Sequence, residues 1–181
     1  MAWTPLSRER HFDKAVGPIR NFSFARKHLL LPILIPELRH ACTTIPIVFA
    51  RREGFFEIFG LVGLEKDNNV YVDVDGNWLV KFVPVCLQTY PCAVTKDEGG
   101  KMALLVDEDS GLVLNRNDGI PFFNEDGNDG AAINNYIVLF RSILRSRRAI
   151  RQACELIEDL GLLVPLEYKN PHISAKTIKV D

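Results

Sequence analysis

The chain of 181 residues is 47% hydrophobic and 25% charged, and its 22 basic and 23 acidic side chains leave a net charge of -1. This length fits one domain whose core needs no disulfide or metal, and the composition is that of a soluble globular protein. The near-zero charge argues against a protein built mainly to bind nucleic acid, and the longest apolar run, Leu29–Pro36, is too short to span a membrane.

The N-terminal segment shows no sustained hydrophobic period. Residues 1–20 carry many charges together with two prolines and a glycine, which predicts an N-terminal arm that lies on the body or is partly disordered. Residues 21–181 are then expected to form a single domain. Met1–Lys14 also lacks the apolar core of a signal peptide, so we expect a cytoplasmic protein.

The next segment is apolar but interrupted by proline. Pro32 and Pro36 cut the run Asn21–Pro36, and this excludes one long helix there. Pro36 instead opens one or two helical turns over Glu37–Thr43, because proline suits the first helical turn. A short apolar strand, Ile47–Phe49, is expected to follow.

The segment between Phe55 and Val83 predicts a meander of three strands. The strands are expected at Phe55–Leu64, Val70–Val74 and Asn77–Val83. Asp75-Gly76 joins the last two, and Asp-Gly between apolar runs is typical of a primed turn, which needs positive φ at both central residues. Such a meander buries one face and needs cover from outside.

A second hairpin is predicted further along the chain. Pro84–Tyr90 is expected to form a single helical turn opened by proline. The runs Cys92–Thr95 and Met102–Val106 then flank a turn that contains two glycines, which predicts a hairpin. Leu112–Leu114 is expected as a short edge strand.

The clearest helical period covers Ala131–Leu160. Its apolar residues form two stripes that are rotated relative to each other by roughly a third of a turn. A straight helix cannot point both stripes at one core, so we expect a break near Ser142–Arg147. Gly161 is a natural helix stop, and Ile173–Val180 is a candidate final strand. The predicted fold class is α+β, a mainly antiparallel sheet (meander plus hairpin) covered by C-terminal helices.

No motif for catalysis or cofactor binding stands out. Asp73 and Asp75 before Gly76 resemble part of a calcium loop, but Tyr71 and Phe82 would then occupy ligand positions that need oxygen donors. That excludes an EF-hand and leaves an improvised acidic site open. The four histidines are far apart and no phosphate loop occurs, so no catalytic residue, metal or cofactor is predicted, although a catalytic site assembled from distant positions stays open.

The four cysteines show no metal-binding or disulfide pattern. They are scattered along the chain without a CxxC pair, at Cys42, Cys86, Cys92 and Cys154. This spacing predicts reduced, structural thiols in a reducing compartment.

Candidate binding residues come from the loops and from one arginine cluster. The long polar loop Asn115–Gly130 is either functional, mobile or an ordinary acidic surface loop. Five aromatic residues are candidates to line a groove, although such side chains more often fill a core: Trp78, Phe82, Tyr90, Phe122 and Phe123. The pair Phe122-Phe123 stands in a polar loop and is the least core-like of these.

The arginine cluster lies on the predicted C-terminal helix and consists of Arg141, Arg145, Arg147, Arg148 and Arg151. Arg141, Arg145 and Arg148 project from one side of it, where they could meet phosphates or an acidic partner. The alternative is a solvated flank neutralised by nearby carboxylates, either those of the acidic loop or those at Glu155, Glu158 and Asp159. We favour the solvated flank because the net charge is near zero.

Several short motifs together resemble the SapC family of bacterial proteins. The family pattern pairs P-I-V-F with G-L, V-D-x-D-G-x-W, V-P and Y-P, and here these motifs fall at Pro46–Phe49, Gly63-Leu64, Val72–Trp78, Val83-Pro84 and Tyr90-Pro91. Cys86 and Cys92 depart from what the resemblance leads us to expect near Y-P. The resemblance implies a link to S-layer protein handling and, loosely, to peptide transport, and it implies no catalytic residue set.

Two functions follow as expectations. The leading one is a non-enzymatic, cytoplasmic accessory protein that binds a protein or peptide partner, in S-layer or surface-protein export as the family name implies. The alternative is an enzyme or small-molecule-binding protein with a site between the loop 115–130 and the sheet.

Overall fold

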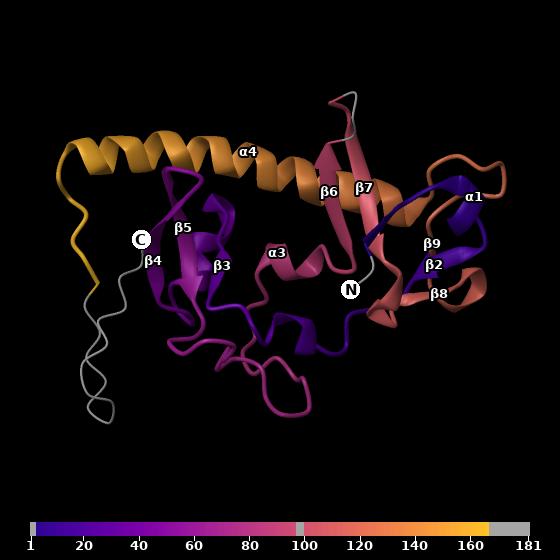
Figure 1. Cartoon of the computed structure of the whole chain (residues 1–181), viewed down its shortest axis with the longest axis horizontal. Helices are drawn as coiled ribbons and strands as arrows, with labels where there is room; N and C mark the ends of the chain where they lie inside the picture. The colour runs from indigo at the N-terminus through magenta and orange to yellow at the C-terminus, as the bar shows by residue number, and fades with distance from the viewer. Residues whose placement is uncertain (1–2, 97–99, 167–181) are drawn as a thin grey trace.

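The computed structural model describes residues 3–96 and 100–166. One long helix, α4 (Ala131–Asp159), runs along the molecule, and three small antiparallel sheets lie beside it (Figure 1). Each sheet has three strands, and short helical turns connect them. The α+β fold class is confirmed, with antiparallel sheets and a C-terminal helix.

The strand bounds show how distant segments pair. Sheet A has the order β1 (Trp3–Pro5), β7 (Met102–Asp107), β6 (Cys92–Lys96). Sheet B has the order β8 (Val113–Asn115), β2 (Lys14–Val16), β9 (Ile120–Pro121). Sheet C has the order β3 (Leu30–Pro32), β5 (Phe55–Leu61), β4 (Ile47–Arg52).

The remaining elements are single turns of helix. Most are placed where the chain crosses between sheets, at α1 (Arg8–His11), η1 (Ser23–Ala25), η2 (Ile35–Glu37), α2 (Leu38–Ala41), α3 (Val85–Gln88), η3 (Glu108–Ser110) and η4 (Arg116–Asp118). As predicted, proline precedes or opens two of these turns, at Pro36 in η2 and Pro84 before α3. The predicted hairpin is present as β6–β7, and Gly161 ends α4 with φ +64. The candidate strand Ile173–Val180 lies outside the described residues.

The predicted break in the C-terminal helix is wrong, because α4 is continuous from Ala131 to Asp159. The two apolar stripes serve different parts of the molecule. Near its N-terminus, Ile133 and Tyr136 pack into a core with Val106 and Phe122. Further along, Ile150 and Cys154 are buried where α4 lies against β5. One continuous helix satisfies both stripes because the first faces this core and the second faces β5.

The N-terminal segment is part of the sheets. Trp3–Pro5 pairs with β7, and Lys14–Val16 is the central strand of sheet B, between β8 and β9. His11 and Ala15 are fully buried. Residues 1–20, for which the sequence predicts an arm, therefore contribute two strands to the folded body over their described part.

The predicted meander is wrong beyond its first strand. Val70–Val74 and Asn77–Val83 are irregular and share only the isolated bridge between Val72 and Trp78. Both edges of β5 are already paired, with β3 and with β4, so no edge remains for a further strand. This segment instead packs its aromatic residues against the second core, which contains Leu31, Ile45 and Val62 among its buried residues.

The turn at Asp75-Gly76 is also not of the primed type. Only Gly76 has positive φ, at +86, whereas a primed turn of type I′ requires it at Asp75 as well. The Asp73 carboxylate accepts hydrogen bonds from the backbone N–H groups of Asp75 at 2.9 Å and Asn77 at 2.8 Å. This side chain closes the turn in place of a hairpin ladder.

All four cysteines are free, as predicted, and their reactivities should differ. Burial raises the pKa of Cys86 and of Cys92 to about 12, whereas Cys42 is exposed. In a thiol titration of native protein we expect Cys42 to react first, because the thiolate is the reactive form. Unfolded, unreduced protein should then give all four thiols, and a smaller number would contradict both the free state and a reducing compartment.

Candidate functional site

An apolar groove, which we call the hairpin groove, lies beside the N-terminal half of α4. It has a volume of about 560 Å³ and lies between α4, β1 and the β6–β7 hairpin. Its walls are mostly apolar, from Leu6, Val94, Met102, Leu104, Ile137, Phe140 and Leu144. Val94 and Leu104 are directly paired across the two strands, so both face the helix.

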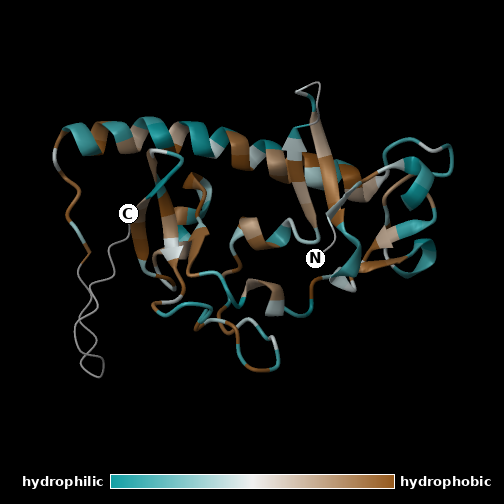
Figure 2. Cartoon of the chain, viewed as in Figure 1, coloured by the Kyte–Doolittle hydropathy of each residue, from teal (hydrophilic) through white to brown (hydrophobic). Residues whose placement is uncertain are grey.

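The hairpin groove continues the first core to the surface. Phe123 and Ile133 belong to that core and also line the groove. Met102, near the outer end of the hairpin, is 50% exposed. Figure 2 shows hydrophobic residues on the strands of this hairpin and on the adjoining part of α4. Three charged side chains, Arg8, Asp129 and Arg141, complete the lining.

The loop 115–130 is folded back on itself beside this groove. The Asp126 carboxylate accepts hydrogen bonds from the backbone and the side chain of Asn128, and these bonds hold the pKa of Asp126 below its ordinary value. The backbone N–H of Gly130 donates to the Phe122 carbonyl at 2.7 Å. The loop thus contributes Phe123 and Asp129 to the lining of the groove. This part of the groove lies between the loop and sheet A.

The expectation that Phe122-Phe123 is the least core-like aromatic pair is wrong. Phe122 is 0% and Phe123 7% exposed, and both belong to the first core. The polar residues around them hid the fact that β9 and the bridge between Phe123 and Asp129 turn both rings inward. Only Phe123 reaches a groove.

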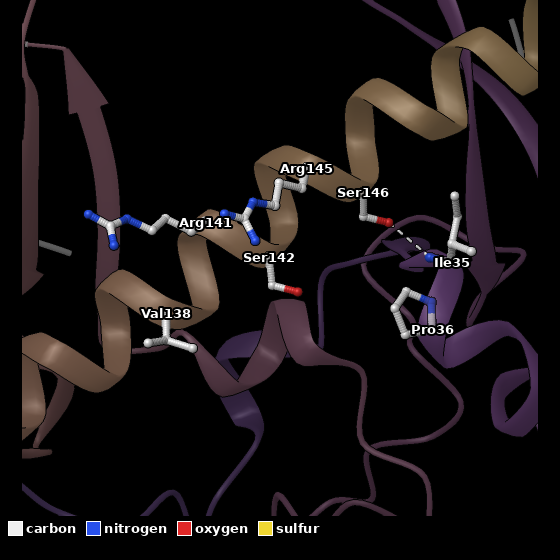
Figure 3. A pocket seen from close by; sticks show the side chains of 7 residues that line it. All are labelled: Ile35, Pro36, Val138, Arg141, Ser142, Arg145 and Ser146. Carbon is white, nitrogen blue, oxygen red and sulfur yellow. Dashed lines mark hydrogen bonds between the residues drawn. The ribbon is translucent and has the colours of Figure 1, made fainter.

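A second groove, which we call the helix groove, lies along α4 beside Ile35 and Pro36 (Figure 3). Its volume is about 550 Å³, and the helix contributes Val138, Arg141, Ser142, Arg145 and Ser146. The Ser146 hydroxyl accepts a hydrogen bond from the backbone N–H of Ile35 at 2.9 Å, which fixes one end of the groove. Arg141 also lines the hairpin groove and therefore stands between the two.

The predicted basic patch is exposed on α4. Arg141, Arg145 and Arg148 are all exposed, and none forms an ion pair with another described residue. The predicted neutralisation by carboxylates at the end of the helix does not form within residues 3–96 and 100–166. There Glu158 pairs with Arg51 of β4, and Glu155 and Asp159 make no ion pair.

The other two arginines of the cluster turn toward sheet C. Arg147 and Arg151 both bind the Oε1 atom of the buried Glu57 on β5, at 2.9 and 2.7 Å, and both also reach Glu53. The hydrogen bond from Arg151 is the main reason why the pKa of Glu53 lies below its ordinary value. This network attaches α4 to β5, and the sequence alone gave no indication of it.

Three further candidate residues lie in the turn around Gly76, and of these only Trp78 packs against the second core. Asp73 holds its turn, and a hydrogen bond from the Asn77 side chain is the main cause of its lowered pKa, whereas Asp75 is exposed. The Trp78 Nε1–H donates to the Phe82 carbonyl at 2.8 Å. The described residues contain no acidic, histidine or cysteine group that could hold a metal ion. The structure therefore does not bring these candidates together with the grooves.

Tyr90 belongs to a buried polar cluster that sequence reasoning missed. Its hydroxyl donates to the Asp107 carboxylate at 3.1 Å, and burial is the main cause that raises the pKa of Tyr90 to about 12. The other Asp107 oxygen is buried and has no hydrogen-bond partner among the described residues. The next residue, Glu108, binds the buried His11 ring at 3.0 Å, which joins the N-terminal segment to η3. Neither pair lines a groove.

The comparisons with known proteins give one match. A family model described as SapC matches residues 6–181 of the chain. No curated protein and no solved structure matches the chain. Among the described residues, no helix has the length and apolar content needed to cross a membrane.

Proposed function

Since the chain belongs to the SapC family, we propose that it is a non-enzymatic accessory protein that binds a protein or peptide partner. The process is the handling or export of S-layer or other surface proteins, and the compartment is the bacterial cytoplasm. The hairpin groove supplies the binding surface. Its open, apolar floor with charged side chains at the rim is the observation that supports this proposal most directly.

The chemistry of the hairpin groove fits an apolar peptide segment that carries a carboxylate. Leu104 and Phe140 offer apolar contact, and Met102 adds a flexible side chain of the kind found at adaptable binding surfaces. Arg8 and Arg141 lie at the lining, where a guanidinium can bind a partner carboxylate. β6, which contributes Val94 to the lining, is an outer strand of sheet A, so a sheet edge lies next to the groove. Recognition of an extended peptide commonly uses such an edge together with side-chain pockets.

A small molecule is the second candidate occupant of the same groove. Its volume of about 560 Å³ falls within the range of ordinary ligand pockets. It also lies between the loop 115–130, through Phe123 and Asp129, and sheet A. An apolar molecule with one acidic group would match the lining.

Met102→Glu should weaken peptide binding in the hairpin groove by about 10-fold or more, because it removes an apolar side chain from the lining and places a charge in an apolar site. The measurement is fluorescence anisotropy with an array of peptides that combine apolar and acidic residues. Val74→Glu is the matched control, because Val74 is 88% exposed on a loop outside both grooves.

Equal binding by wild type and Met102→Glu would contradict the placement in the hairpin groove. If no peptide of the array binds while an apolar acid raises the melting temperature of wild type but not of Met102→Glu, the small-molecule candidate replaces the peptide.

A further inference from the structure

The exposed side of α4 has its charges separated into a basic and an acidic half. Arg141 and Arg145 stand in the first half, and Glu155 and Asp159 in the second. At about 100° per residue, these four positions lie within roughly 80° of one another around the helix axis. All four are exposed and belong to one stripe on the side turned away from the cores.

This stripe does not compensate its own charge. Arg141 and Arg145 are spaced i, i+4, as are Glu155 and Asp159, and like charges at this spacing repel. Acidic residues near the C-terminus of a helix also oppose the helix dipole. Within the described part of the chain, none of these four side chains has an ion-pair partner. By contrast, Arg147 on the inner side is fully engaged with Glu57.

Exposed apolar side chains accompany the charges. Val138 is 65%, Leu144 42% and Leu156 61% exposed. Leu144 and Leu156 are equally distant from residue 150 along the chain and lie on the two sides of the charged stripe. In an antiparallel pair of helices that cross near residue 150, these two leucines from opposite copies therefore lie at the same height and enclose the stripe between them.

The charged residues are also placed symmetrically about residue 150. Arg145 and Glu155 are equally distant from residue 150, and so are Arg141 and Asp159. We propose that two copies of this chain associate through the exposed faces of their α4 helices, antiparallel, with each basic half on the acidic half of the other copy. This proposal goes beyond the proposed function.

The symmetry of this pairing explains why the partner of the exposed α4 face is a second copy of the chain. In a two-fold dimer every contact occurs twice, so each acid–base pair is made on both sides of the axis. A parallel arrangement would set Arg141 against its own equivalent and would be repulsive. Ala149 lies near the crossing point and is exposed, so its small side chain allows a close approach of the helices.

The helix groove receives part of the second copy in this arrangement. Asp159 of the second copy lies opposite Arg141, which lines this groove together with Val138 (Figure 3). A nucleic acid or an anionic membrane surface would instead face the acidic half of the stripe and be repelled by it.

The test is sedimentation velocity of the full chain over a concentration series. Wild type is expected to be a dimer whose dissociation constant rises with salt. Arg141→Glu/Arg145→Glu and Glu155→Arg/Asp159→Arg should each raise the dissociation constant by about 100-fold or more, because each sets like charges face to face. An equimolar mixture should restore the dimer, because the first variant is wholly acidic and the second wholly basic at these four positions.

Arg20→Glu/Lys27→Glu is the matched control, because it makes the same charge change at exposed positions outside α4. Circular dichroism and the melting temperature establish that each variant is folded. A monomeric wild type, a double variant that stays dimeric, or a mixture that stays monomeric would each overturn the proposal. Glu155 and Asp159 line neither groove, so in Glu155→Arg/Asp159→Arg the dimer can fail while peptide binding in the hairpin groove persists.

Discussion

Replacing both Arg147 and Arg151 with alanine is expected to lower the free energy of unfolding by about 3–5 kcal/mol. The Glu57 side chain is only 3% exposed, and these two guanidinium groups are its ion-pair partners among the described residues. Without them a carboxylate remains buried and unpaired, which costs far more than an exposed ion pair contributes. Urea denaturation followed by circular dichroism measures the change.

Matched variants separate the buried pairs from general effects of removing charge. Arg148→Ala removes a charge from the exposed side of the same helix and should change stability by about 0.5 kcal/mol or less. Each single alanine variant at Arg147 or Arg151 should cost less than half of the double variant, because one partner of Glu57 remains. Adding Glu57→Met to the double variant should restore part of the loss, since it removes the unpaired charge. A double variant as stable as Arg148→Ala would show that Glu57 is not held as the structure describes.

The same network has a defined pH dependence at Glu53. Its pKa is lowered in the folded state, first by the hydrogen bond from Arg151 and then by the charge of Arg147. A group with a lowered folded pKa contributes stability above its ordinary pKa and loses it as the pH falls through the folded value. The stability difference between wild type and the double arginine variant should therefore narrow in acid.

Local patterns predicted the elements that depend on local chemistry. Proline at the first turn predicted the helical turns at η2 and α3, and the glycine pair predicted the β6–β7 hairpin. Gly161 predicted the end of α4. Each of these features depends on backbone preferences within a few residues. The family resemblance also agrees with the match over residues 6–181.

Long-range pairing could not be predicted in this way. The strand-like residues Val70–Val74 have no strand partner, because β3 pairs with the edge of β5 that they would need. β3 lies more than 30 positions earlier in the sequence. The pairing of β1 with β7 is equally non-local. The predicted helix break assumed a single core, whereas α4 buries one stripe in the first core and the other against β5. Each error comes from a contact between segments that are distant in sequence.

The candidate site shows the same division. Helical periodicity alone predicted that Arg141, Arg145 and Arg148 lie on one side of the helix. In the structure all three are exposed on α4. The hairpin groove depends on β1, β6, β7 and α4 meeting in space, which no local pattern contains. Phe123 was named for its polar neighbours, yet it contributes to the groove from the core.

Gly76→Val should destabilise the fold by about 2–3 kcal/mol, through two separate causes. Gly76 has φ +86, a conformation that a β-branched residue resists. A Cβ atom at this position would also overlap the Asn21 side-chain amide. That amide donates to the Asp75 carbonyl at 2.8 Å, and the Phe22 N–H donates to the Gly76 carbonyl at 2.7 Å. The substitution therefore strains the turn and displaces the segment that carries Phe22 into the second core.

Gly111→Val separates these two causes of destabilisation. Gly111 has φ +71, but a Cβ atom there would meet nothing within 4 Å, so only the backbone strain applies. We expect Gly111→Val to cost about 1 kcal/mol, and the excess at Gly76 to report the contact with Asn21. Asn21→Ala should reduce that excess, because it removes the overlapping amide in advance. Equal urea midpoints for Gly76→Val and Gly111→Val would mean that the turn at Gly76 does not hold Asn21, and the second core would then be anchored elsewhere.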